Sequence, residues 1–108
     1  MYAIAIHGGA GALGRAEMTP EKEARYRAAL DSALQIGENV LRNGGSALDA
    51  VTQTVQWLED CPLFNAGRGA VFTHEGRNEL DASIMEGRTQ MAGAVGGTVG
   101  LAAVKEAG

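Results

Sequence analysis

The sequence predicts an α+β fold, and three of its features support this. The chain begins with a short apolar run that ends in closely spaced glycines, which is typical of a buried strand. Two segments with helical periodicity follow in direct succession within residues 19–60. Short apolar runs separated by turn residues occupy residues 70–95, as in an antiparallel meander. Helices grouped apart from the later strands favour α+β over a repeated strand–helix–strand unit.

The first predicted element is a strand over Tyr2–Ile6, in which larger apolar residues alternate with alanines. Closely spaced glycines follow it at Gly8, Gly9 and Gly11. Glycine permits positive φ values and a close approach of the backbone to another group. The end of this strand is therefore a predicted small-molecule site.

One interpretation of these glycines is a dinucleotide-binding turn, because Gly9, Gly11 and Gly14 match the pattern G-x-G-x-x-G. That motif requires a helix to begin at the glycines, so that the pyrophosphate meets the helix N-terminus. The next helix signal comes only at Thr19, and a second helix follows where a parallel strand is required. The spacing therefore disfavours this alternative.

Two helices are predicted next, over Thr19–Asn43 and Ala47–Asp60. Thr19 suits the N-cap position of the first, with Pro20 as its first helical residue. Ser46 suits the N-cap of the second. The apolar positions expected to form the inner face of the second helix are Leu48, Val51, Val55 and Leu58.

Antiparallel strands are predicted over Ala70–Thr73, Asn78–Met85 and Thr89–Val95, with glycine-containing turns between them.

The composition limits the partners of this fold. A net charge of −4 without a basic stripe opposes nucleic-acid binding. No apolar run approaches the roughly 18 residues of a membrane helix, and the N-terminus lacks a signal-peptide pattern. A single cysteine excludes an internal disulfide. We therefore expect one domain, residues 1–108, in the cytoplasm, with no nucleic-acid or membrane partner.

Four segments, in this order, resemble the plant-type L-asparaginases, also called isoaspartyl peptidases. They are AIHGGAG (Ala5–Gly11), CPLFNAGRGAVFT (Cys61–Thr73), ELDASIMEG (Glu79–Gly87) and MAGAV (Met91–Val95). The resemblance implies an N-terminal-nucleophile hydrolase, whose fold is an αββα sandwich. The predicted strand, two helices and meander would form part of that sandwich. Such enzymes are precursors that cut themselves before a threonine and act on L-asparagine and β-aspartyl dipeptides.

The resemblance places this chain in the first part of the N-terminal subunit. The implied partners are the C-terminal subunit of the same precursor and a second copy of the resulting heterodimer. Most of the family's catalytic and substrate-holding residues lie in the later subunit, so we expect at most trace activity from this chain alone. The alternative is a non-catalytic remnant or minimal engineered scaffold of the fold. If the chain is a fragment, we expect it to expose apolar surface.

Thr98 is the candidate nucleophile within the chain. Gly97-Thr98-Val99-Gly100 matches the family's short self-cleavage signature, and an N-terminal threonine can act because its freed amine takes the hydroxyl proton near neutral pH. The alternative is that residues 96–99 continue the strand that begins at Met91.

The resemblance also implies a structural sodium ion in the loop Leu58–Gly69. This loop combines Pro62 with two close glycines, which allows carbonyl oxygens to turn inward, and hard cations bind such oxygens. Carried over by match, the main-chain ligands are Leu58, Glu59, Cys61, Phe64, Ala66 and Arg68. No organic cofactor is implied. The alternative is an ordered connector without a metal.

Asn65 matches the family's asparagine that positions the nucleophile; alternatively, it hydrogen-bonds its own loop. His7 stands alone at a strand end, and we expect it to have a structural hydrogen-bonding role. Cys61 is expected to be a small buried residue. Asp49 and Asp81 are expected to be a helix cap and a strand-end or core-facing carboxylate, without catalytic roles.

Overall fold

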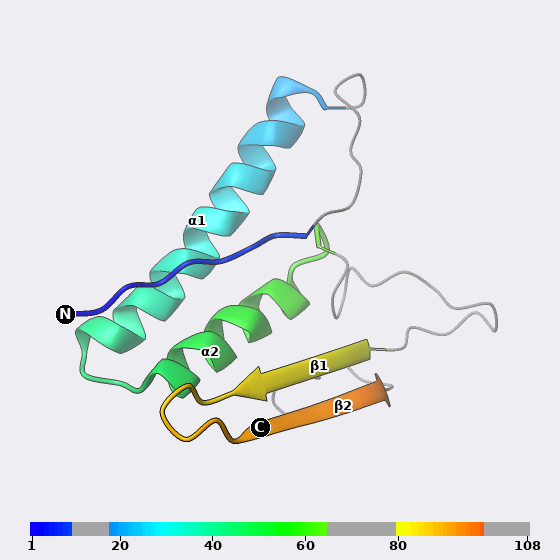
Figure 1. Cartoon of the computed structure of the whole chain (residues 1–108). Helices are drawn as coiled ribbons and strands as arrows, with labels where there is room; N and C mark the ends of the chain where they lie inside the picture. The colour runs from blue at the N-terminus through cyan, green and yellow to red at the C-terminus, as the bar shows by residue number, and fades with distance from the viewer. Residues whose placement is uncertain (10–17, 65–79, 99–108) are drawn as a thin grey trace.

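The computed structural model describes residues 1–9, 18–64 and 80–98 (Figure 1). In that part of the chain the elements are α1 (Pro20–Arg42), α2 (Ala47–Asp60), β1 (Leu80–Met85) and β2 (Ala92–Thr98). The two helices pack against each other, and the strands form a two-stranded antiparallel sheet. The fold class is therefore α+β, as predicted. The complete sandwich implied by the resemblance stays a prediction.

Both helices begin and end where their capping residues predict. The Thr19 hydroxyl accepts the Lys22 N–H at 3.1 Å, and the Ser46 hydroxyl accepts the Asp49 N–H at 3.1 Å. These bonds satisfy N–H groups that have no partner within the first helical turn. Gly44 follows the C-cap of α1 with φ +84°, the left-handed conformation that glycine favours.

Small residues bring the helices together. Gly37 of α1 is buried, and a Cβ built on it would lie closer than 3.0 Å to the Thr54 hydroxyl of α2 and to the Ile4 side chain. Ala33 and Ala50 are also buried. Helices whose facing residues lack bulk can approach closely, so a glycine, two alanines and a threonine form this interface.

The inner face predicted for α2 was wrong. Its buried residues are Ala50, Thr54 and Glu59, whereas Val51 is 41% exposed. The other predicted positions, Leu48, Val55 and Leu58, are only half-buried. The close approach at Gly37 rotates the small residues of α2 toward α1, and this leaves the larger apolar side chains at the margin of the interface.

The strand predicted over Tyr2–Ile6 is also not a strand in the structure. Residues 2–6 run as an extended segment alongside the helices (Figure 1). The Ile4 side chain lies next to Gly37 of α1. A strand requires a neighbouring strand for its ladder of hydrogen bonds. Among the described residues, β1 and β2 pair only with each other, so the segment has no ladder to join.

The hairpin differs from the predicted meander at its turn. β1 and β2 pair in regular register from Met85↔Ala92 to Ala82↔Val95. The predicted strand start at Thr89 was wrong, because residues 87–89 form a turn and Gln90 has φ +61°. β2 also continues to Thr98, three residues beyond the predicted end. The first predicted strand, Ala70–Thr73, lies outside the described residues.

Candidate functional site

The candidate site lies where the glycine turn meets the start of the loop after α2. A Cβ built on Gly8 would lie 3.1 Å from Leu30 Cδ2 and 3.3 Å from Phe64 Cε1. Phe64 is 7% exposed, and its ring also packs edge-on against Tyr26, with 5.9 Å between the ring centroids. Gly8 is therefore a true close approach. It joins the first two of the four segments that resemble the hydrolase family.

His7 shapes the glycine turn. Its Nδ1 accepts the backbone N–H of Gly9 at 3.0 Å, and Gly9 has φ +117°. An acceptor Nδ1 carries no proton, so the bond requires the neutral imidazole. This is the structural hydrogen-bonding role expected of a histidine at this position.

Four of the predicted sodium ligands lie in the described part of the chain, and they cluster at the end of α2. The Leu58 carbonyl accepts the Cys61 N–H at 3.2 Å, and the Cys61 carbonyl accepts the Phe64 N–H at 3.4 Å. The last carbonyls of a helix lack intrahelical partners and lie at the negative end of its dipole. Each carbonyl oxygen keeps a second lone pair. Carbonyl oxygens at this helix end therefore suit a hard cation.

The other predicted residues of this loop, Asn65, Ala66 and Arg68, lie outside the described residues. Within the described ranges, no group of three or more histidine, cysteine or acidic side chains is placed to hold a metal. Cys61 carries a free, half-buried thiol.

Glu59 is a feature of this region that sequence reasoning missed, since it was considered only for its carbonyl. Glu59 is 3% exposed, although acidic residues are rarely buried so deeply. A carboxylate in the last turn also meets the unfavourable end of the helix dipole.

An open apolar cavity adjoins the glycine turn. Its volume is about 200 Å³, and it is lined by residues 4–7 on one side and by Val51, Thr54, Val55 and Leu58 of α2 on the other. Three of the four apolar residues of α2 that were predicted to face inward thus form part of one wall of this cavity, and Leu48 does not line it. Exposed apolar side chains also occur on the hairpin, where Met85 is 57% and Met91 74% exposed. The expected exposure of apolar surface is confirmed.

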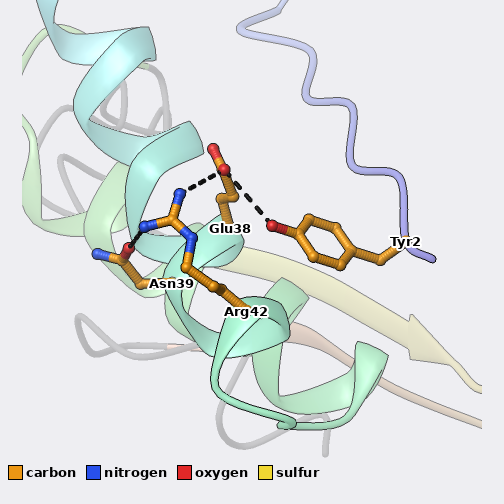
Figure 2. A network of polar contacts seen from close by, with 4 residues as sticks. All are labelled: Tyr2, Glu38, Asn39 and Arg42. Atoms are coloured by element: carbon orange, nitrogen blue, oxygen red, sulfur yellow. Dashed lines mark hydrogen bonds and ion pairs between the residues drawn. The ribbon is translucent and has the colours of Figure 1, made fainter.

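A polar network holds the N-terminal segment beside α1 (Figure 2). The Tyr2 hydroxyl donates to Glu38 Oε1 at 3.5 Å, and Arg42 pairs with the same oxygen at 2.6 Å. Arg42 also donates to Asn39 Oδ1 at 3.3 Å. The hydrogen bond with Glu38, and secondarily the neighbouring Tyr2 hydroxyl, raises the pKa of the Arg42 guanidinium above its ordinary value. Because these groups are exposed, the network contributes orientation more than stability.

Thr98 is the last residue of β2 and pairs in register with Leu80. Its place in the strand agrees with the structural alternative for this residue, while its chemical role stays a prediction. The preceding Gly97 has φ +61°, and its N–H donates to Asp81 Oδ1 at 2.8 Å. Asp81 is exposed at the start of β1, so it is a strand-end carboxylate and not a core-facing one.

Neither α1 nor α2, the two helices of the described part, has the length and apolar character needed to cross a bilayer.

The geometry is that of a small α+β unit. Its glycine segment, residues 8 and 9, and the start of the loop after α2 meet beside an open cavity, as in many small-molecule sites.

Comparison with known proteins defines the class. A family model described as Asparaginase matches residues 1–107. The chain is 57% identical to an isoaspartyl peptidase of Salmonella typhimurium over 94 residues, 87% of this chain and 30% of the relative. It is 48% identical to a plant-type L-asparaginase of Pyrococcus furiosus over 101 residues, 94% of this chain and 31% of the relative.

The chain therefore belongs to the asparaginase family that includes isoaspartyl peptidases and plant-type L-asparaginases. It spans about 30% of the length of the curated relatives it matches, in their N-terminal part. The resemblance inferred from the four sequence segments is confirmed at the level of the family.

Proposed function

We propose that this chain is the N-terminal part of a threonine-nucleophile amidohydrolase that acts on L-asparagine and β-aspartyl dipeptides. The names of the similar proteins support the substrate class. The observation that carries the proposal is the packing of Gly8 against Phe64. This contact joins the glycine segment to the loop that precedes Asn65, two segments that lie far apart in the sequence and both belong to the motifs that carry the resemblance.

In the proposed enzyme this chain supplies positioning. The carbonyl oxygens at the end of α2, with those of Ala66 and Arg68, would hold a sodium ion that orders the loop. The ordered loop would then present the Asn65 amide to the nucleophilic threonine. A sodium ion would contribute only fixed charge and coordination there. The protein groups would orient the reacting threonine, and such orientation is a large part of catalysis in a preorganised site.

The remaining parts of the proposed enzyme come from outside this chain. We propose that a C-terminal subunit supplies the nucleophile and the groups that hold the substrate, that two heterodimers associate, and that the enzyme is cytoplasmic. The open cavity between the N-terminal segment and α2 supports this proposal, because such an apolar surface is expected where another part of a protein packs. The chain alone should then show at most trace activity.

A chimera tests the proposed function. Residues 1–95 of this chain would replace the matching segment of the Salmonella typhimurium isoaspartyl peptidase, and ammonia release from L-asparagine and cleavage of a β-aspartyl dipeptide would be measured. We expect activity, its loss on Asn65→Ala, and little change on Asn39→Ala, a substitution of an exposed asparagine on α1. A folded chimera without substitutions that lacks activity, or one whose activity survives Asn65→Ala, contradicts the proposal; the first result favours the non-catalytic remnant.

The second candidate function is that Thr98 itself is the nucleophile. It is supported by the backbone of Gly97 directly before it, whose positive φ would be strained in a residue other than glycine. Intact-mass measurement of the chain separates the alternatives. A fragment of eleven residues that begins at Thr98, absent in Thr98→Ala, supports self-cleavage. A single uncut mass assigns this threonine to the strand only.

A further inference from the structure

The pairing of β1 with β2 changes register at one point. Ala82 pairs with Val95, but Leu80 pairs with Thr98. A single residue of β1, Asp81, therefore faces two residues of β2, Gly96 and Gly97. This is a β-bulge, in which one strand carries an extra residue.

The Asp81 carboxylate closes this bulge. Its Oδ1 accepts the Gly97 N–H at 2.8 Å across sixteen residues of sequence. Gly97 has φ +61°, a conformation that is accessible to glycine at little cost. The Cβ that Gly96 lacks would lie 3.4 Å from the same Oδ1, an ordinary contact. The specific constraint is therefore the hydrogen bond to Gly97, which is of the stronger kind because its acceptor is charged.

The bulge decides what lies opposite Thr98. Without the extra residue, the regular register of the hairpin would continue and residue 79 would face position 98. With it, position 98 faces Leu80, which is 5% exposed and is the most buried residue of β1. Because side chains alternate along a strand, a slip of one residue exchanges the two faces for every later position.

We propose that Asp81 is a positioning residue: its carboxylate selects the bulged register of β2 and thereby places the Gly97–Thr98 peptide opposite Leu80. The inference deepens the proposed function and rests on it where it concerns Thr98 as the nucleophile. The register of the hairpin does not depend on that role. Asp81 touches no reacting atom in this role.

Amide hydrogen exchange of the 108-residue chain, followed by NMR, tests the proposal. In Asp81→Ala, exchange at Gly97 should accelerate roughly tenfold or more, because a hydrogen bond to a charged group is lost, and the cross-strand contact between residues 80 and 98 should disappear. Asp81→Asn keeps an oxygen acceptor, so it should restore both in part. Glu86→Ala is the matched control, since it removes a carboxylate from the other end of the hairpin and should change neither.

The unaltered chain provides a second measurement that does not depend on the variants' folding. As acid protonates Asp81, the Gly97 amide resonance should shift, whereas that of Gly93, in the regular part of the ladder, should not. The proposal is overturned if the Gly97 resonance ignores this protonation, or if Asp81→Ala keeps slow exchange and the 80–98 contact. These measurements do not involve activity, so the proposal and the proposed function can fail separately.

Discussion

Substituting Gly37 by alanine tests the packing that orients the N-terminal segment and α2. In an exposed helix, this change would raise stability by about 1 kcal/mol, because alanine has the higher helix propensity. At Gly37 the added methyl group would lie closer than 3.0 Å to both the Ile4 side chain and the Thr54 hydroxyl. The end of Ile4 can rotate away. Thr54 cannot do so freely, because its hydroxyl donates to the Ala50 carbonyl at 2.7 Å in a buried setting.

The outcome follows from comparing these contributions. Rotating Thr54 would leave a buried hydroxyl without its bond, at a cost of about 1–3 kcal/mol, and overpacking a helix interface costs a similar amount. The unfavourable contributions exceed the gain in propensity. We therefore expect Gly37→Ala to lower the free energy of unfolding by about 1–5 kcal/mol, when the roughly 1 kcal/mol gain is subtracted from the two costs.

Urea denaturation followed by circular dichroism measures this change. Ala28→Gly, at an exposed position of α1, isolates the propensity contribution and should cost about 1 kcal/mol. Thr54→Ala removes one of the two contacts, so Gly37→Ala should cost less in that background than in the unaltered chain. A gain in stability from Gly37→Ala alone, equal to the propensity difference, would refute the packing argument.

Four further outcomes are expected. Phe64→Ala should lower the free energy of unfolding by roughly 3 kcal/mol in urea titration, because it removes a buried ring from between Gly8 and Tyr26. Replacing sodium by a bulky organic cation at equal ionic strength should lower the Tm, and Gly67→Val should remove that sensitivity; an indifferent Tm would identify a plain connector. Arg42→Ala should leave the urea midpoint unchanged within error, since its network is exposed. Finally, the chain alone should release ammonia from L-asparagine only at trace level, and release well above the blank that disappears in Thr98→Ala would contradict this.

The ends of the helices were predictable because their signals are local. The Thr19 hydroxyl bonds an N–H three residues away, and the Ser46 hydroxyl does the same. Any sequence with these residues at these places offers the same short-range bonds, whatever the rest of the fold does. The helix spans and the left-handed Gly44 follow from the same local rules.

Contacts between distant segments were not predictable in this way. The bulge depends on the hydrogen bond between Asp81 and Gly97 across the hairpin. The residues next to Asp81 in the sequence do not indicate that Gly97 is its partner. The meeting of Gly8 with Phe64 likewise joins residues 56 positions apart. For the site, the sequence supplied the segments through their family resemblance, while their contact at Phe64 required the structure.

The wrong inner face of α2 is informative about the proposed function. Periodicity along a helix reflects the burial that the complete protein provides, whereas the described residues contain only the contacts of this part. Val51, Val55 and Leu58 have the pattern of buried residues, yet they line an open cavity beside the N-terminal segment. That segment has the composition of a buried strand and has no neighbouring strand among the described residues. Both discrepancies are resolved together if a further part of the proposed hydrolase, corresponding to the portion of the relatives that this chain does not span, covers the cavity and pairs with residues 2–6.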